Sequence, residues 1–226
     1  MPVDVPDDIE LTAPQARVLG CLIEKRATTP ETYPLTLKAL VTACNQSSSR
    51  FPVVEYDAQL VETTALALKS KGLVRVVHPA HGERATRYRH VVDEALGLDE
   101  AELAVIGVLL LRGAQTVAEL RTRTERLHAF AGPGEVEAVL GSLAARSTPM
   151  VAHLERQVGQ KESRWLQMLE ADPEGRAAAI PSSGGAAARS ARVDVDRVEQ
   201  LEGRVAALEA LVARLLDELG VEAQSE

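Results

Sequence analysis

The chain has 226 residues, a formal net charge of −8 and only 3% aromatic residues, a length that accommodates one or two domains with hydrophobic cores. Most of the acidic excess lies in residues 171–226, so the nearly neutral remainder neither requires nor excludes a nucleic-acid partner. The sequence has no apolar run of roughly 20 residues and no signal peptide at its amino terminus, which predicts a cytoplasmic protein without membrane contact.

The first predicted helix, over residues 13–26, is repeated later in the chain. Thr12 and Gln15 form a capping box at its start, and a stripe of apolar residues at helical spacing follows. At an offset of 87 positions, Asp99 and Glu102 form a second capping box before the same pattern. The aligned pairs are Val18 with Val105, Leu19 with Ile106, Gly20 with Gly107 and Leu22 with Leu109. This self-similarity predicts a duplicated domain.

Two further helices and a hairpin are predicted in the first copy. The elements are a helix over 37–44, a polar turn over 45–56, a helix over 57–71 and strands over 73–77 and 84–92. Thr36 and Asp57 cap the two helices, and Gly72 ends the second. The inward face of that helix is expected to carry Leu60, Val61, Thr64 and Leu68.

The second copy predicts the same order of elements. Helices are expected over 100–112, 117–124 and 135–146, and strands over 150–154 and 164–168. Three helices followed by a hairpin form the winged-helix arrangement. The predicted fold class is therefore mostly α with small β-hairpins (α+β), with two tandem winged-helix domains at 11–95 and 96–170 after a loose segment at 1–10.

A change of composition follows the second copy. Residues 171–192 are rich in Ala, Gly, Ser and Pro, which predicts a flexible linker. Residues 193–220 predict a coiled-coil helix. Its a and d positions are Val198, Leu201, Val205, Leu208, Val212, Leu215 and Leu219. Val at a and Leu at d favour a two-stranded coil, so we expect a homodimer.

Three runs of residues resemble the bacterial YceH family. They are EKRATTPETYPLTLKALVTACNQ from residue 24, LLLRGAQT from residue 109 and QKESR from residue 160. The similarity extends from Leu11 to Leu169 and implies a tandem winged-helix protein with no established biochemical activity. The chain departs from the family pattern beside Arg50, where Ser49 and Phe51 replace an Asn and an acidic residue.

No arrangement of residues indicates catalysis. The sequence contains no nucleophile elbow, no phosphate-binding glycine loop and no HExxH motif. His78 and His81 form an HxxH pair near His90, but a metal site needs three or four converging ligands. Cys21 and Cys44 lie in predicted helices outside any metal spacing and are expected to be buried thiols. We therefore expect no catalytic residues, no metal and no cofactor.

Basic residues of the two hairpins are the candidates for nucleic-acid contact. The set is Arg75, Arg84, Arg87 and Arg89 in the first hairpin, Arg156, Lys161 and Arg164 in the second, and Arg50 in the polar turn. Strand alternation places Arg87 and Arg89 on one face and Tyr88 on the other. Phosphate contact and a simply solvated hairpin face both remain open.

The predicted third helices argue against base-specific readout. Glu55, Asp57 and Glu62 lie at the start of one, and Glu135 and Glu137 at the start of the other, where a groove-reading helix usually presents basic or amide side chains. The sequence thus predicts a non-enzymatic, dimeric, DNA-associated regulator that contacts double-stranded DNA through its wings. The alternative is an adaptor that binds a protein partner through winged-helix surfaces.

We expect the coiled coil to drive a parallel dimer. In parallel pairing, Arg197 and Arg204 at g positions face Glu202 and Glu209 at e positions of the other helix, whereas antiparallel pairing opposes like charges. Light scattering should give a dimer for the whole chain and a smaller species for a chain truncated at Ala171. A monomeric whole chain at tens of micromolar, or a fully dimeric truncated chain, would contradict this.

Overall fold

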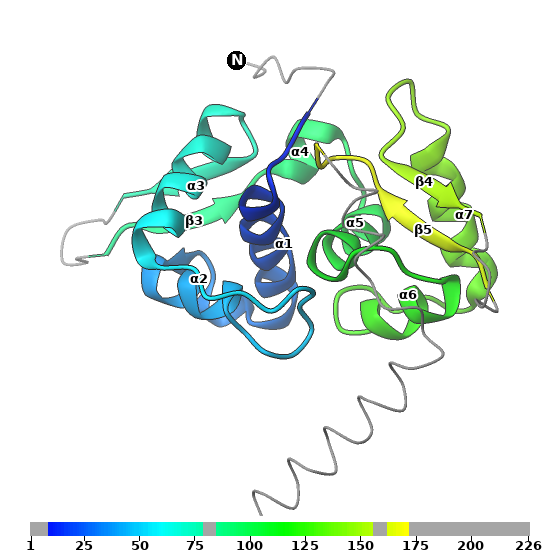
Figure 1. The fold of residues 1–226 in the computed structure, drawn as a ribbon, viewed down its shortest axis with the longest axis horizontal. Coiled ribbons are helices and arrows are strands. Elements are labelled where there is room, and N and C mark those ends of the chain that lie inside the picture. Colours follow the sequence, from blue (N-terminus) through cyan, green and yellow to red (C-terminus); the bar gives the residue numbers. More distant parts are fainter. Residues whose placement is uncertain (1–8, 79–84, 156–161, 172–226) are drawn as a thin grey trace, which may run out of the picture. The chain divides into compact units, whose positions relative to one another are not determined.

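The computed structural model describes residues 9–78, 85–155 and 162–171 (Figure 1). The first copy comprises α1 (Ala13–Thr28), η1 (Pro30–Thr32), β1 (Leu35–Thr36), α2 (Leu37–Cys44), α3 (Ala58–Ser70), β2 (Val74–Val77), β3 (Arg87–His90) and α4 (Val92–Leu96). The second comprises α5 (Glu100–Arg112), α6 (Val117–Thr124), α7 (Pro133–Ala144), β4 (Val151–Leu154) and β5 (Arg164–Gln167). The protein is therefore mostly helical with small antiparallel sheets, and both copies belong to one compact unit. The predicted linker and coiled coil lie outside the described residues.

The helix starts follow the predicted capping chemistry. Thr12 and Asp99 each accept a hydrogen bond from the backbone N–H three residues later. Gln15 and Glu102 return the contact, accepting from the cap residue's own N–H at 3.0 and 3.3 Å. These reciprocal bonds satisfy N–H groups that the first turn of a helix leaves unpaired, so a short sequence pattern determines where α1 and α5 begin.

Besides the single 3-10 turn η1, two short elements are absent from the sequence prediction. β1 pairs with β3, with Leu35 opposite Tyr88, which makes the first sheet three-stranded in the order β1-β3-β2. Apart from its first residue, α4 lies between the predicted strand over 84–92 and the predicted helix over 100–112, where no element was predicted. A strand of two residues and a helix of five are too short to show a period, so neither leaves a pattern in the sequence.

The inward face of α3 is slightly narrower than predicted. Val61, Thr64 and Leu68 are buried, as expected, but Leu60 is 40% exposed. Successive helical residues are 100° apart, and this places Leu60 at the edge of the stripe that Val61 and Leu68 define.

The centre of the structure is the packing of α1 against α5, which lie side by side (Figure 1). A Cβ atom added to Gly107 would lie 2.7 Å from Cγ2 of Ile23, and one added to Gly20 would lie 2.9 Å from Cγ of Leu111. These distances are shorter than van der Waals contact, so both helices approach closely only because each has a glycine at the crossing. The two glycines occupy equivalent positions of the repeat.

Backbone hydrogen bonds also join the two copies. Leu11 donates to the carbonyl of Leu169 at 2.7 Å, and Ala171 donates back to Leu11 at 3.0 Å. Phe51, in the turn between α2 and α3, donates to the carbonyl of Leu111 at the end of α5. The polar turn is therefore held against the second copy. No helix within the described ranges combines the length and apolarity needed to cross a membrane.

Replacing Gly107 with alanine should destabilise the protein by about 1–3 kcal/mol, because the new methyl group meets a branched methyl of the buried Ile23 that cannot rotate away. Gly141, in α7, is the matched control, since a Cβ there has no atom within 4 Å. Gly141→Ala should stabilise by about 0.5–1 kcal/mol. Urea unfolding monitored by circular dichroism measures both, and equal effects of the two substitutions would contradict the close helix crossing.

Candidate nucleic-acid interface

Three of the predicted arginines lie on one face of the β2–β3 hairpin. Tyr88 is 2% exposed, and Arg87 and Arg89 flank it on the opposite, outward face, which confirms the predicted alternation. Arg75 of β2 is directly opposite Arg89 in the antiparallel register. Because cross-strand partners share a face of the sheet, Arg75, Arg87 and Arg89 form one cluster, which we term the hairpin arginine face.

Glu94 of α4 partly neutralises this face. Its two carboxylate oxygens lie 3.1 Å from an Nη of Arg75 and 3.7 Å from an Nη of Arg89. Like charges directly opposite each other on a sheet repel, and an anion between them relieves that repulsion. The side chains of Arg75 and Glu94 are about half exposed, so each pair contributes little to stability and exchanges readily with solvent or another anion. Arg87 donates to the carbonyl of Pro34 at 3.0 Å.

His90 adds no charge to the hairpin near neutral pH. It points to the buried side of β3, and burial, which disfavours the protonated imidazole, lowers its pKa to about 4. The nearby Asp93 carboxylate, 3.4 Å from Nδ1, opposes this shift without reversing it. His90 is therefore neutral at mildly acidic pH as well.

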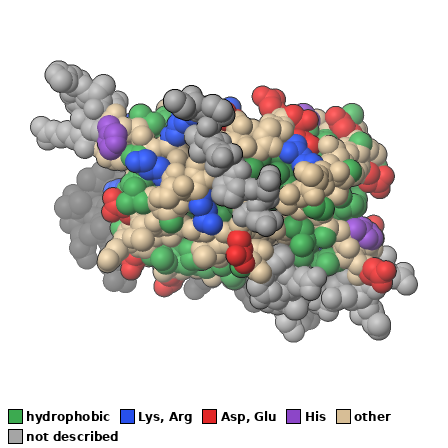
Figure 2. Space-filling model, turned by 90° about the horizontal axis from the view of Figure 1, so that it is seen from above, with side chains coloured by type: hydrophobic (Ala, Val, Ile, Leu, Met, Phe, Trp, Pro, Cys, Tyr) green, Lys and Arg blue, Asp and Glu red, His purple; other side chains and the backbone are tan. Residues whose placement is uncertain are grey.

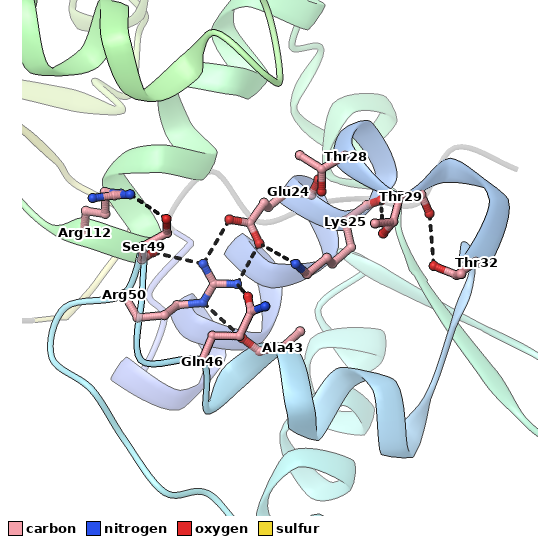
Figure 3. A network of polar contacts seen from close by, with 10 residues as sticks. All are labelled: Glu24, Lys25, Thr28, Thr29, Thr32, Ala43, Gln46, Ser49, Arg50 and Arg112. Carbon is pink, nitrogen blue, oxygen red and sulfur yellow. Dashed lines mark hydrogen bonds and ion pairs between the residues drawn. The ribbon is translucent and has the colours of Figure 1, made fainter. Parts of the chain in front are cut away.

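Arg50 lies inside the protein, so the structure does not support its expected contact with phosphate. Its guanidinium donates to both carboxylate oxygens of Glu24, at 3.0 and 2.6 Å, and to Oε1 of Gln46 at 2.7 Å (Figure 3). Its Nε donates to the carbonyl of Ala43, and the side chain is 0% exposed. Arg50 thus joins α1, α2 and the turn before α3. Glu24 of α1 is its ion-pair partner.

The pKa of Glu24 reflects this pairing. Burial alone would raise the pKa of the carboxyl group, but the hydrogen bonds and positive charge of Arg50 outweigh burial and hold it below its usual value. The ionised form is therefore the stable one in the folded protein. Glu24 and Arg50 are 26 residues apart, and no local pattern in the sequence pairs them.

Arg164 in the second hairpin is also turned inward. It donates to the carbonyl of Ala114 at 2.8 Å and to a carboxylate oxygen of Glu119 at 2.9 Å, and its side chain is 10% exposed. It connects β5 to the start of α6 rather than presenting a surface cation. The other predicted site residues, Arg84, Arg156, Lys161 and the seven coiled-coil residues from Val198 to Leu219, lie outside the described residues.

The exposed faces of the third helices carry few cations. Leu66, 45% exposed, lies on the solvent face of α3, with Gln59, Glu62 and Thr63 toward the start of the helix and Lys69 and Ser70 toward its end. In Figure 2, basic side chains of the described residues occur singly among hydrophobic and acidic ones on the face shown. Within the described ranges, no three His, Cys, Asp or Glu side chains gather in a metal-binding arrangement.

Fold and site together define a class of protein, namely a mostly helical α+β protein made of two copies of one helix-and-hairpin unit, with a basic face on the first hairpin. A family model described as "Protein of unknown function, DUF480" matches residues 11–160. The chain belongs to this family, also called UPF0502, and the resemblance to YceH-like bacterial proteins is thereby confirmed.

Relatives in the family are similar over nearly their whole length. The UPF0502 protein of Geotalea uraniireducens (strain Rf4) is 47% identical over 199 residues, which cover 88% of this chain and 90% of the relative. That of Pseudomonas fluorescens (strain Pf0-1) is 46% identical over 213 residues, covering 92% and 95%. That of Burkholderia multivorans (strain ATCC 17616 / 249) is 41% identical over 219 residues, covering 96% and 92%.

Replacing Glu24 with glutamine should destabilise the protein by about 3–5 kcal/mol at pH 7, because it leaves the buried Arg50 without a counter-charge. Since the folded-state pKa of Glu24 is lowered, the ionised carboxylate stabilises the fold above the unfolded-state value of about 4.3, and this contribution is lost as the pH falls further. The difference from wild type should therefore shrink below about pH 4.

Denaturant unfolding between pH 3 and 7 tests this expectation. Glu31→Gln, which changes an exposed glutamate, is the control and should behave as wild type over the same range. An undiminished difference at pH 3, or wild-type stability of Glu24→Gln at pH 7, would rule out the proposed role of the pair.

Proposed function

We propose that the protein is a non-enzymatic, DNA-associated regulator made of two winged-helix domains, 11–95 and 96–170, that acts in the cytoplasm as a dimer. The observation that carries the proposal is the hairpin arginine face, on which Arg75, Arg87 and Arg89 share one exposed side of the wing. The order of elements, three helices followed by an antiparallel hairpin in each copy, supports the winged-helix assignment.

The wing would contact phosphates rather than base edges. Guanidinium groups bind phosphate oxygens with charge-assisted hydrogen bonds and displace the counterions of the duplex. Near its start the exposed side of α3 offers Gln59, Glu62 and Thr63, and its cation Lys69 comes only in the last turn, whereas a groove-reading helix usually presents basic side chains near its amino end. Binding of this kind is weakly dependent on sequence and strongly dependent on salt.

Glu94 sets the affinity of such a contact. In the free protein its carboxylate interacts with Arg75 and Arg89, so a phosphate must compete with it for both guanidinium groups. A neutral glutamine at this position would leave the two arginines to the phosphate. The proposal therefore predicts that removing the arginines weakens DNA binding and that neutralising Glu94 strengthens it. A variant that simply failed to fold would not bind more tightly.

A second function, a protein-binding adaptor, is favoured by the surface of α3. Leu66 lies at the centre of its exposed face, and Val53 in the preceding turn is 57% exposed. Apolar side chains at the centre of an exposed face, with polar ones around them, are typical of protein interfaces. In this case α3 would contact a protein partner, and the hairpin arginine face would be solvated.

Electrophoretic shift of a random duplex across a salt series distinguishes the two functions. For the wild type, we expect binding that weakens steeply as salt rises. Changing Arg75, Arg87 and Arg89 together to alanine should reduce the slope of log K against log salt by up to about three, close to one for each lost phosphate contact. Glu94→Gln should bind more tightly than wild type.

Arg121→Ala, which removes an exposed cation of α6, is the matched control and should bind as wild type. Circular dichroism of each variant checks that the helices are intact. If the wild type does not bind duplex at low salt, the regulator proposal is excluded and the adaptor remains. If the triple variant binds as well as wild type, the hairpin is not the contact.

A further inference from the structure

A polar cavity of about 190 Å³ lies between the two copies and is not used by the hairpin arginine face. The end of α1 and the turn before α3 form one side, and the ends of α5 and α6 form the other. Four cations line it, namely Lys25, Arg112, Arg123 and Arg126. Hydroxyl groups of Ser48, Ser49, Thr28 and Thr29 complete its polar lining.

Positive charge exceeds negative charge in this cavity. Glu24 is the carboxylate among the lining residues, and both of its oxygens accept hydrogen bonds from the buried Arg50. Nζ of Lys25 also lies 3.3 Å from Oε2 of Glu24. Arg123 lies 3.5 Å from Glu119, which is itself shared with Arg164. Arg112 and Arg126 form no ion pair with any described residue. The two carboxylates at the cavity, Glu24 and Glu119, are therefore shared with other cations and are outnumbered by the positive charges around them.

Arg112 is the best placed of these cations to bind an anion. Figure 3 shows its guanidinium extending from α5 toward the turn, where it donates to Oγ of Ser49 at 2.6 Å beside the Arg50–Glu24 pair. Burial lowers the pKa of Arg112, the neighbouring charges of Arg123 and Arg50 lower it further, and the carboxylates of Glu24 and Glu119 oppose this shift without reversing it. A partly desolvated cation facing other cations is a strained arrangement that a bound anion would relieve.

The turn itself is shaped around this contact. Ser49 has a φ of +59°, in the left-handed region that residues other than glycine rarely adopt. In this conformation its hydroxyl bonds to Arg112 while its carbonyl accepts from Arg50 at 2.9 Å. Ser49 thus fixes the position of Arg112 at the wall of the cavity.

We propose that this cavity is a binding site for a small oxyanion of the phosphate class, held by Arg112, Arg123 and Arg126 with help from the serine hydroxyls. Its volume is below the roughly 300–1,000 Å³ of pockets for drug-sized ligands, which favours inorganic phosphate or the phosphate group of a small monoester over a nucleotide. Planar guanidinium groups match the geometry of phosphate oxygens. The inference does not depend on DNA binding.

Such a ligand would tie the two copies together. Its contacts would come from the turn of the first copy and from α5 and α6 of the second, so binding would stabilise the packing of α1 against α5. A ligand that binds only the folded state raises the free energy of unfolding by RT ln(1 + [L]/Kd). The occupancy of the cavity would then set how firmly the copies are held.

Isothermal titration calorimetry with inorganic phosphate, at ionic strength matched with chloride, tests the site. The wild type should show saturable binding at one site per chain. Arg112→Gln combined with Arg123→Gln should weaken it by at least about tenfold, because charge-assisted hydrogen bonds are lost. Arg121→Gln is the control, since it removes an exposed α6 cation outside the cavity. Arg123→Gln alone changes a partly exposed side chain and should weaken binding while leaving the fold intact.

Glycerol 3-phosphate in a parallel titration separates the two sources of the anion. Tighter binding than inorganic phosphate identifies a monoester as the better ligand, and weaker binding identifies the free ion. The Arg75, Arg87 and Arg89 triple variant should bind phosphate as wild type, so this result is independent of the DNA experiment. Absence of saturable binding of both probes to the wild type, or unchanged binding in the Arg112 and Arg123 double variant, would overturn the proposal.

Discussion

The close crossing of α1 and α5 at Gly20 and Gly107 is the constraint on which the rest of the structure depends. Each glycine admits a side chain of the opposite helix at a distance that a Cβ atom would forbid. Because the duplicated first helices meet in this way, the end of each lies beside the other copy. The turn before α3 then reaches Leu111, and the amino-terminal Leu11 pairs with the chain around Leu169 and Ala171. One short contact between equivalent positions thus arranges both copies.

Charge is distributed according to this packing. Two arginines that look like surface cations in the sequence, Arg50 and Arg164, are buried and paired with Glu24 and Glu119. Breaking such a pair is costly because it strands a charge away from water, so these residues serve the fold. In the described part of the first hairpin, the exposed basic residues are Arg75, Arg87 and Arg89. The choice between DNA and a protein partner therefore rests on this hairpin and on the apolar centre of α3.

In both the cavity between the copies and the hairpin arginine face, arginines lie close together and repel one another, but the two sites differ in the counter-charge that the protein supplies. On the hairpin, Glu94 supplies an internal anion between Arg75 and Arg89. In the cavity, Glu24 is already committed to Arg50, and Arg112 has a hydroxyl rather than a carboxylate as its neighbour. Where the protein provides the counter-charge, an external anion must compete for the arginines. Where it does not, binding an anion relieves repulsion, so the cavity is the better small-anion site.

Local patterns in the sequence determined the helix starts, the repeat and the alternation around Tyr88, because capping and strand alternation depend on residues within a few positions of one another. The family followed from longer runs. Only the tertiary structure decided the pairing of β1 with β3, the exposure of Leu60, the burial of Arg50 and the contact of Arg112 with Ser49. Arg50 and its partner Glu24 are 26 positions apart in the sequence, and Arg112 and Ser49 are 63 positions apart. Such contacts arise from how helices pack, and a single sequence carries no local signal of which distant side chains that packing will bring together.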